Sequence, residues 1–315
     1  RQDGRAGGRV RLSRPAQRAR GHQRRRRQCD GALGDPRVPS NQHAKDILLG
    51  MRFKLDLYVN FRPCVLLAPE LSPLKSIEGP IRLEIFRENT EGEYTGMGGS
   101  LKSGTPDEVA LEENIATRKG VERIIRSAFE YADSRGRGRV TLVDKSNVMR
   151  YVGGLWRRVF SEVGEEYPGI EQDAMYVDAM AMDLVRRPER YEVIVASNLF
   201  GDIISDLAAE VTGGLGLAPS ANIHPGRNAL FEPVHGSAPD IAGTGRANPL
   251  GAIGCVGLLL DHFGYREAAA RVERAIVASF QAGQTTPDLG GQLSTEQVGT
   301  WILEHLESTP AGAAS

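Results

Sequence analysis

The sequence predicts an α/β fold, because short apolar runs with the character of buried strands alternate with longer segments of helical periodicity. The clearest case is the run Val193 to Ala196, which is followed by apolar residues at helical spacing between Ile203 and Ala208. The length of 315 residues is enough for about two domains. No GxGxxG fingerprint joins a strand to a helix, so a Rossmann fold is not expected.

The composition is that of an ordinary globular protein, with 40% hydrophobic and 25% charged residues. No apolar run approaches the roughly 20 residues of a membrane span. The three cysteines, Cys29, Cys64 and Cys255, are scattered and form no CxxC pair. We therefore expect neither a disulfide framework nor a zinc site, and a reducing, cytoplasmic location fits best.

The charge is distributed unevenly along the chain. Residues 1–27 carry eleven arginines and one acid, a net charge of +10, which leaves −11 for the rest. Such a stretch has too few apolar residues to build a strand or a packed helix. It suits a nucleic-acid arm or an organellar transit peptide. Because it lacks interleaved aromatic residues that could stack on bases, nucleic acid is not a favoured partner.

Beyond this stretch the expected elements follow in order. A helix is expected over Asp46–Asp56, a strand over Leu55–Asn60 that ends before Phe61, and a second strand over Ile81–Phe86. The glycine-rich stretch Gly96–Gly104 is expected to be a flexible loop. The alternation continues with a helix at Thr117–Arg135, a strand at Arg137–Asp144, and helices at Asn147–Phe160, Asn248–Phe263, Glu267–Ala282 and Thr295–Leu306.

Three arginines stand near the ends of successive elements in this first part of the chain. Arg52 lies near the end of the expected helix, Arg62 follows the first strand and Arg87 follows the second. A single arginine is most often an exposed surface charge. Three of them closing successive elements favour another interpretation, the bidentate capture of carboxylates.

A pair of acidic residues marks the helix that follows Val193–Ala196. Asp202 and Asp206 are four residues apart, so both carboxylates project from one face. They could be solvated acids near the positive end of the helix dipole. Alternatively they could share a divalent cation, and hard oxygen ligands suit Mg²⁺ or Mn²⁺. Asp178 lies in the apolar stretch YVDAMAM, where an acid needs a partner such as a metal unless it is exposed on a helix.

A second dense stretch, Phe231–Asp240, has a composition suited to ligand binding. Gly236 and the small residues around it allow a ligand to approach the backbone closely. Asp240 could accept hydrogen bonds from a ribose diol, whereas a basic residue there would suit a 2′-phosphate.

These motifs resemble the metal- and NAD-dependent β-decarboxylating dehydrogenases, the isocitrate/isopropylmalate dehydrogenase family. The resemblance is carried by NLFGDIISDLAAEVTGGLGLAPSANI and FEPVHGSAPDIAGTGRANP, and by LLGMR, NFRP, RENTEGEY and VDKSNV. It extends from about Gly31 to about Leu306. It implies a two-domain fold with a shared central sheet, and NAD-dependent oxidative decarboxylation of a 2-hydroxy dicarboxylic acid with Mg²⁺ or Mn²⁺.

The resemblance also implies a role for each matching residue. Arg52, Arg62 and Arg87 would bind substrate carboxylates, Tyr94 would protonate the enolate carbon, and Lys145 would act as the proton-shuttling base. Asp202 and Asp206 would bind the metal together with Asp178 of a second subunit, so a homodimer with shared active sites is expected. The implied NAD-binding residues are His235, Gly236, Ser237, Ala238, Asp240 and Asn248.

Family members begin with a strand and a GDGIGPE turn, and neither precedes Gly31 here. We therefore interpret residues 1–30 as a basic segment that is disordered or derived from a misread frame, and an inactive, truncated relative stays an alternative. The expected domains are a cofactor-side domain, residues 31–58 plus 213–315, and a substrate, metal and dimerisation domain, residues 59–212.

The branch of the family is indicated by apolar residues near the expected substrate. Leu48 and Leu49 precede Arg52 by one turn, and Val148 follows the catalytic lysine motif. In the isopropylmalate branch such residues line the pocket for the isopropyl group, so 3-isopropylmalate is the expected substrate, in leucine biosynthesis. RENTEGEY and Lys45 instead favour the tartrate and D-malate branch, which stays the alternative.

Overall fold

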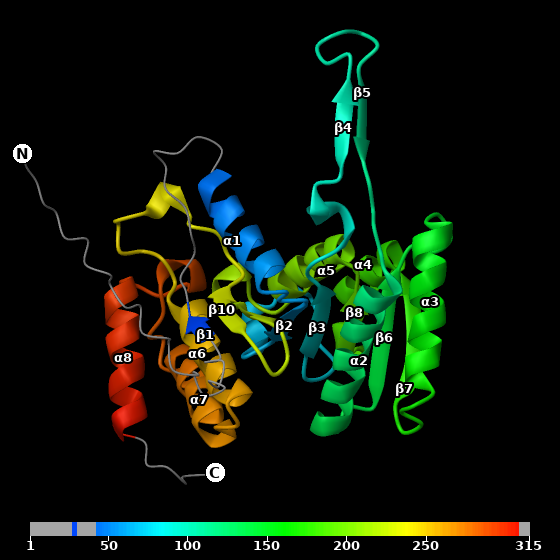
Figure 1. Ribbon diagram of the computed structural model, residues 1–315. Helices are drawn as coiled ribbons and strands as arrows, with labels where there is room; N and C mark the ends of the chain where they lie inside the picture. Colours follow the sequence, from blue (N-terminus) through cyan, green and yellow to red (C-terminus); the bar gives the residue numbers. More distant parts are fainter. Residues whose placement is uncertain (1–26, 30–41, 309–315) are drawn as a thin grey trace, which may run out of the picture.

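The computed structural model describes residues 27–29 and 42–308 and contains one large mixed sheet (Figure 1). Its eight strands lie in the order β1-β10-β9-β2-β3-β8-β6-β7. Strands β3, β8, β6 and β7 are parallel to one another, β1 is parallel to β10, and the pairs β10/β9, β9/β2 and β2/β3 are antiparallel. Their bounds are β1 Arg27–Cys29, β2 Val59–Val65, β3 Arg82–Glu88, β6 Arg139–Asp144, β7 Glu171–Tyr176, β8 Val193–Ala196, β9 Pro219–Ile223 and β10 Ala229–Pro233.

Helices cover the sheet in two groups (Figure 1). The group at the β3/β8/β6/β7 end is α2 Arg118–Arg135, α3 Arg150–Gly164, α4 Val177–Arg186 and α5 Asn198–Val211. The group at the β9/β10 end is α1 Gln42–Lys54, α6 Leu250–His262, α7 Arg266–Gln281 and α8 Thr295–Ser308. The predicted α/β class is therefore confirmed, and so are most of the predicted helices, with ends shifted by a few residues.

Side chains along β8 point alternately to the two faces of the sheet, and helices pack on both faces. Val193 and Val195 pack into a core with α2 and α3, whereas Ile194 and Ala196 pack into a second core with α4 and α5. Successive side chains of a strand point to opposite faces, so an uninterrupted apolar run indicates a strand buried on both sides. A third core joins α6, α7 and α8.

Two strands differ from the prediction in a way that matters for the site. The chain turns after α1, with Asp56 at a positive φ of 49°, and β2 begins only at Val59. Arg62 and Arg87 therefore lie inside β2 and β3 rather than after them. Pro63 is tolerated in β2 because β9 pairs only with Val59–Phe61, so the proline lies beyond that ladder.

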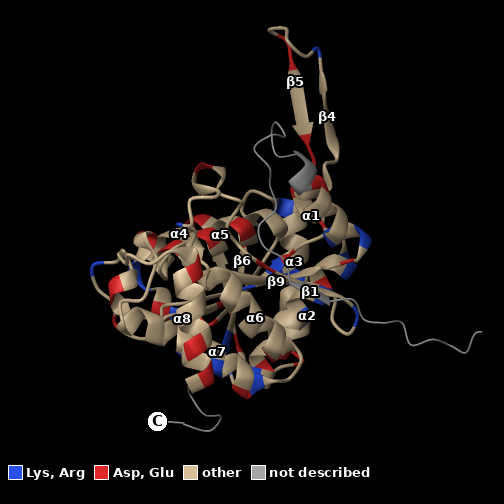
Figure 2. Ribbon diagram, turned by 90° about the vertical axis from the view of Figure 1, so that its left-hand side faces the viewer, with Lys and Arg blue, Asp and Glu red and all other residues tan. Residues whose placement is uncertain are grey.

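The segment expected to be a flexible loop is instead part of a β-hairpin. Strands β4 (Gly98–Leu101) and β5 (Val109–Glu112) pair antiparallel. Both views show this hairpin standing clear of the rest of the molecule (Figures 1 and 2). Its apolar side chains are exposed, Leu101 by 69% and Leu111 by 57%.

At the N-terminal side, Arg27–Cys29 form the short strand β1 beside β10, although no strand was expected in the basic segment. The predictions for the rest of residues 1–30 fall outside the described residues. Among the helices that the structure describes, none combines the length and the apolar character needed to cross a membrane.

Candidate active site

The site is built on the adjacent strands β2 and β3. Asn60 lies opposite Arg87 in the antiparallel register, and Arg62 lies two residues beyond Asn60. The three side chains therefore point to the same face of the sheet, which is the face that α5 covers. Both arginines are deeply buried, with Arg62 7% exposed and Arg87 1% exposed. A buried guanidinium requires a counter-charge.

Helix α5 supplies that counter-charge. Arg62 donates from Nη1 to Asp206 Oδ1 at 2.9 Å, and its Nη2 lies 3.1 Å from Asp202 Oδ1. Arg87 also forms an ion pair with Asp202 through Nη1. Asp202 and Asp206 thus face the arginines from consecutive turns of one helix, as their spacing predicted.

A glycine lets α5 approach so closely. A Cβ at Gly201 would lie 2.7 Å from Cβ and Cγ of Arg87 and 3.1 Å from its Cα. No real side chain tolerates such contacts with a buried neighbour. Gly201 therefore sets the distance between α5 and β3, and with it the distance between Asp202 and Arg87.

Tyr94 reaches the same group from the short helix η3, Gly92–Thr95. Its hydroxyl donates to Asp202 Oδ2 at 2.6 Å, and the Arg87 guanidinium lies 4.9 Å from its ring centroid. Burial and the hydrogen bond to Asp202 raise the pKa of the Tyr94 phenol above its ordinary value of 10.0. The phenol is therefore protonated at neutral pH and available as a proton donor.

The two carboxylates on α5 differ in acidity. Burial opposes ionisation of Asp202, but Arg87 and Arg62 outweigh it and hold the pKa below its usual value. For Asp206, burial dominates and raises the pKa, with the neighbouring Asp202 acting in the same direction and Arg62 against it. Two oxygen-donor side chains one turn apart suit Mg²⁺ or Mn²⁺. Within the described part of a single chain, no three His, Cys, Asp or Glu side chains converge on one point.

Lys145 and Asp178 form a separate pair. Lys145 follows β6, Asp178 lies in the first turn of α4, and the Lys145 Nζ lies 2.5 Å from Asp178 Oδ1. This hydrogen bond to Lys145 lowers the pKa of Asp178. Among the described residues, the pair makes no hydrogen bond or ion pair with the arginines, Asp202 or Asp206. The expectation that Asp178 serves a second subunit stays a prediction.

Arg52 is placed near the site by polar residues that the sequence analysis missed. Its Nη2 lies 3.3 Å from Glu232 Oε1 on β10. Glu232 accepts from Asn222, Asn222 accepts from Asn60, and Asn60 accepts from Arg62. Asn198 likewise accepts from Arg87 Nε at 2.9 Å. An amide between two apolar strand residues, as at Asn60 and Asn222, is the sequence signal that could have found them.

The expected NAD-binding residues fall mainly in the loop after β10. His235 Nδ1 lies 3.0 Å from the Gly236 carbonyl, and its Nε2 is buried without a hydrogen-bond partner among the described residues. Ala238 has a positive φ of 44°, and Asp240 is exposed. Asn248 lies apart from this loop at the start of α6, where its Oδ1 accepts from the Leu250 N–H and its Nδ2 donates to Asp288.

The expected substrate-pocket residues do not form one cluster in the single chain. Leu48 and Leu49 are half-buried on α1, close to Arg52. Val148 is 71% exposed in the turn after Lys145.

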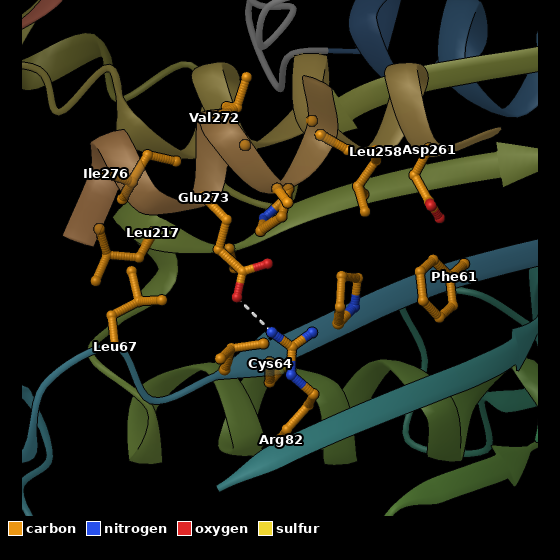
Figure 3. A pocket seen from close by; sticks show the side chains of 18 of the residues that line it. Phe61, Cys64, Leu67, Arg82, Leu217, Leu258, Asp261, Val272, Glu273 and Ile276 are labelled. Atoms are coloured by element: carbon orange, nitrogen blue, oxygen red, sulfur yellow. Dashed lines mark hydrogen bonds and ion pairs between the residues drawn. The ribbon is translucent and has the colours of Figure 1, made fainter. Parts of the chain in front are cut away.

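A cavity of about 390 Å³ lies elsewhere, between β2 and helices α6 and α7 (Figure 3). Phe61 and Pro63, which alternate with Arg62 along β2, line it together with Leu217, Leu258 and Ile276. None of the expected site residues lines it. The ion pair Arg82–Glu273 joins β3 to α7 across the cavity, and the ion pair Arg135–Asp261 joins α2 to α6. The cavity is therefore on the other side of β2 from the charged group.

Comparisons with known proteins agree on one family. The family model described as isocitrate/isopropylmalate dehydrogenase matches residues 15–302. The chain is 47% identical over 279 residues to a 3-isopropylmalate dehydrogenase of Thermobifida fusca, covering 88% of this chain and 78% of that protein. It is 52% identical over 250 residues to a 3-isopropylmalate dehydrogenase of Mycobacterium tuberculosis, covering 79% and 74%.

Solved structures show the same likeness in three dimensions. An isocitrate dehydrogenase from Methylococcus capsulatus superposes with a TM-score of 0.82 at 40% identity, covering 90% of this chain and 82% of that chain. The TT0538 protein from Thermus thermophilus superposes with a TM-score of 0.80 at 36% identity, covering 91% and 57%.

Proposed function

Because the chain belongs to the isocitrate/isopropylmalate dehydrogenase family, we propose that it oxidatively decarboxylates 3-isopropylmalate to 2-oxoisocaproate with NAD, a step of leucine biosynthesis. The observation that carries the proposal is the group of charged and polar side chains on β2, β3, η3 and α5. Two guanidinium groups, two carboxylates and a protonated phenol meet there. This combination suits a substrate that has two carboxylates and must receive a proton.

The residues of the chain divide the work between binding and proton transfer. Arg62 and Arg87, with Arg52 beside them, would bind the two substrate carboxylates by charge-assisted hydrogen bonds. Substrate carboxylates would then replace Asp202 and Asp206 as the acceptors of those donors. Lys145 would take the hydroxyl proton, and Tyr94 would deliver a proton to the carbon that loses its carboxylate.

The cofactors supply the remaining chemistry. When bound, NAD would accept the hydride, and Mg²⁺ or Mn²⁺ would polarise the new carbonyl so that the β-carboxylate leaves as CO₂. Asp202 and Asp206 would hold the cation, together with Asp178 of a second copy. His235, Gly236, Ser237, Ala238, Asp240 and Asn248 would hold the NAD.

Substrate preference tests the proposal directly. If Leu48, Leu49 and Val148 contact an isopropyl group, each excluded methylene is worth about 0.8 kcal/mol, and kcat/KM should favour 3-isopropylmalate over D-malate about a hundredfold or more. Leu48→Ser should reduce this preference and leave D-malate turnover unchanged. The control is Ile47→Ser, since Ile47 is 47% exposed on the same helix. A wild-type preference for D-malate or tartrate would instead assign the chain to that branch.

Cofactor preference gives a second test. Asp240 would repel a 2′-phosphate and accept from a ribose diol, so NAD should be used better than NADP. Asp240→Lys should narrow or reverse the ratio of the two kcat/KM values. Equal use of NADP by the unchanged chain would contradict the assigned role of Asp240.

We further propose a homodimer in which Lys145 and Asp178 serve the neighbouring site. Exposed apolar residues support it: Leu101, Val109 and Leu111 on the hairpin, Met182 and Val185 on α4, and Ile203 on α5. A monomer rarely leaves so many large apolar side chains exposed without a partner surface. The same proposal includes a cytoplasmic location and two domains, residues 31–58 plus 213–315 and residues 59–212. Neither of the described thiols, Cys64 and Cys255, is in a disulfide, which suits a reducing compartment.

A further inference from the structure

A continuous row of buried polar side chains crosses the sheet beside the proposed site. In the strand register, Arg87 of β3 lies opposite Asn60 of β2, which lies opposite Asn222 of β9. Glu232 of β10 follows on the same side of the sheet. Asn60 and Asn222 are fully buried and Glu232 is 6% exposed, so water does not satisfy these groups.

The hydrogen bonds along this row can run in only one direction. Arg62 Nε, which has no acceptor capacity, donates to Asn60 Oδ1 at 2.8 Å. An ionised Glu232 has no donor, so the Asn222 Nδ2 must face it, and the two atoms lie 2.8 Å apart. The remaining bond, Asn60 Nδ2 to Asn222 Oδ1 at 2.8 Å, then has its polarity fixed from both ends. Asn89 Nδ2 also donates to Asn222 Oδ1 at 2.9 Å and to the Leu57 carbonyl at 2.9 Å, so Asn89 fixes the orientation of Asn222 as well.

Glu232 also connects Arg52 to the row. Its Oε1 accepts from Asn222 and lies 3.3 Å from Arg52 Nη2, so one carboxylate oxygen serves both Arg52 and the row that leads to Arg62. An amide at this position would still offer its carbonyl oxygen to both donors, so the row tolerates Gln here. Replacing Asn222 by Leu instead removes the acceptor of Asn60 Nδ2 and the link to Glu232. Asn60 then loses the partner that holds its amide against Arg62, and a buried donor is left without an acceptor.

We propose that Asn60 and Asn222 are positioning residues, which hold Arg62 through a one-directional chain of hydrogen bonds that Glu232 and Asn89 fix at its far end. The proposal rests on the proposed function only in assigning Arg52 and Arg62 to substrate carboxylates. The orientation of Arg62 itself is a property of the chain without substrate.

The test can therefore be made on the chain without substrate. In the full chain with ¹⁵N-labelled arginine, the Arg62 Nε–H signal should exchange with water about five- to tenfold faster after Asn222→Leu, as expected for the weakening of one buried hydrogen bond. The internal control is Arg87, whose Nε donates to Asn198. Its signal should not change. A matched control is Glu232→Gln, which keeps the acceptor for Asn222 and should leave the Arg62 signal as in wild type. An unchanged Arg62 signal in a folded Asn222→Leu chain would overturn the proposal.

A second variant keeps the test decisive if Asn222→Leu fails to fold. Asn60→Leu removes the acceptor of the Arg62 Nε–H itself, so the Arg62 signal should exchange faster in this variant as well. Asn60→Asp still accepts from Arg62, is the matched control and should keep the signal protected. If a folded Asn60→Leu chain leaves the Arg62 signal as in wild type, the row does not hold Arg62 and the proposal is wrong.

Substrate binding then separates the two hypotheses. Calorimetry with 3-isopropylmalate should show about tenfold weaker binding for Asn222→Leu than for wild type, since Arg62 loses its alignment, with NAD binding unchanged. If wild type binds no hydroxy acid while the arginine signals respond as expected, the proposed function fails and the positioning chain stands.

Discussion

At the scale of single residues, Asp202 is the acceptor on which the site converges. It accepts from Arg62, Arg87 and the Tyr94 hydroxyl, whereas among the described residues Asp206 accepts from Arg62 alone. Because Asp202 faces two guanidinium groups and Asp206 faces one, the pKa of Asp202 is lowered and that of Asp206 is raised on the same helix. A cation that binds both would meet one carboxylate already ionised and a second that loses its proton less readily.

Tyr94→Phe is predicted to lower kcat about 10²- to 10⁴-fold, the usual contribution of a general acid. Substrate affinity should change little, because the arginines remain. Since the Tyr94 pKa is raised above 10.0, the phenol is protonated at every lower pH. The rate should therefore fall by the same factor across the neutral and mildly alkaline range, which steady-state pH profiles of both proteins would check. A loss confined to one end of that range would show that Tyr94 titrates there and is not the assigned donor.

How much of the site can be foreseen depends on the kind of residue. Arg62, Arg87 and the two aspartates carry charge in recognisable motifs, and the structure brings them together with Tyr94. Asn60, Asn222 and Glu232 lie in the motifs NFRP, APSANI and FEPVHG, but the motifs do not show that these side chains contact one another. Their importance comes from strand register, which pairs residues 60 and 222 across a long stretch of sequence. Periodicity within a segment contains no information on that pairing.

At the scale of elements, the packing of α5 on β3 determines the geometry of the site. Gly201→Ala is predicted to push the helix away from Arg87 and to lower the free energy of unfolding by about 1–3 kcal/mol, the usual cost of overpacking. Urea denaturation would measure it, and 3-isopropylmalate binding should weaken in parallel. The matched control is Gly154→Ala on α3, where a Cβ meets nothing within 4 Å. That change should stabilise the chain by about 0.5–1 kcal/mol. If Gly201→Ala were as stable as the control, contact at this glycine would not set the helix position.

Element boundaries were the less predictable part of the fold. Helices α2 and α5 and strand β8 follow directly from apolar periodicity. Strand β2 was placed too early, because Leu55 to Tyr58 continue an apolar pattern that the left-handed Asp56 interrupts. The β4/β5 hairpin was missed because its strands are exposed on both sides and show no burial pattern.

At the scale of the whole molecule, a shared active site makes a prediction about mixtures. Lys145→Ala and Asp202→Ala chains should each be inactive, because each lacks one contribution to every site. After subunit exchange, mixed dimers should regain one intact site, so activity should return to about a quarter of the wild-type value. Native mass spectrometry would confirm that mixed dimers form, and each variant exchanged with itself is the control. Mixed dimers without activity would place Lys145 in its own chain's site.

The narrow pairing of β2 with β9 has a mechanical consequence. β9 pairs with β2 only at Val59–Phe61, whereas β3 pairs with β2 along Val59–Val65. Within the sheet this pairing joins the two groups of elements, so a rotation of one group against the other would bend the sheet along this line. The partly exposed pairs Arg82–Glu273 and Arg135–Asp261 also join the two groups and would oppose such a rotation. Salt weakens exposed ion pairs. A rotation of this kind should therefore become easier as the ionic strength rises.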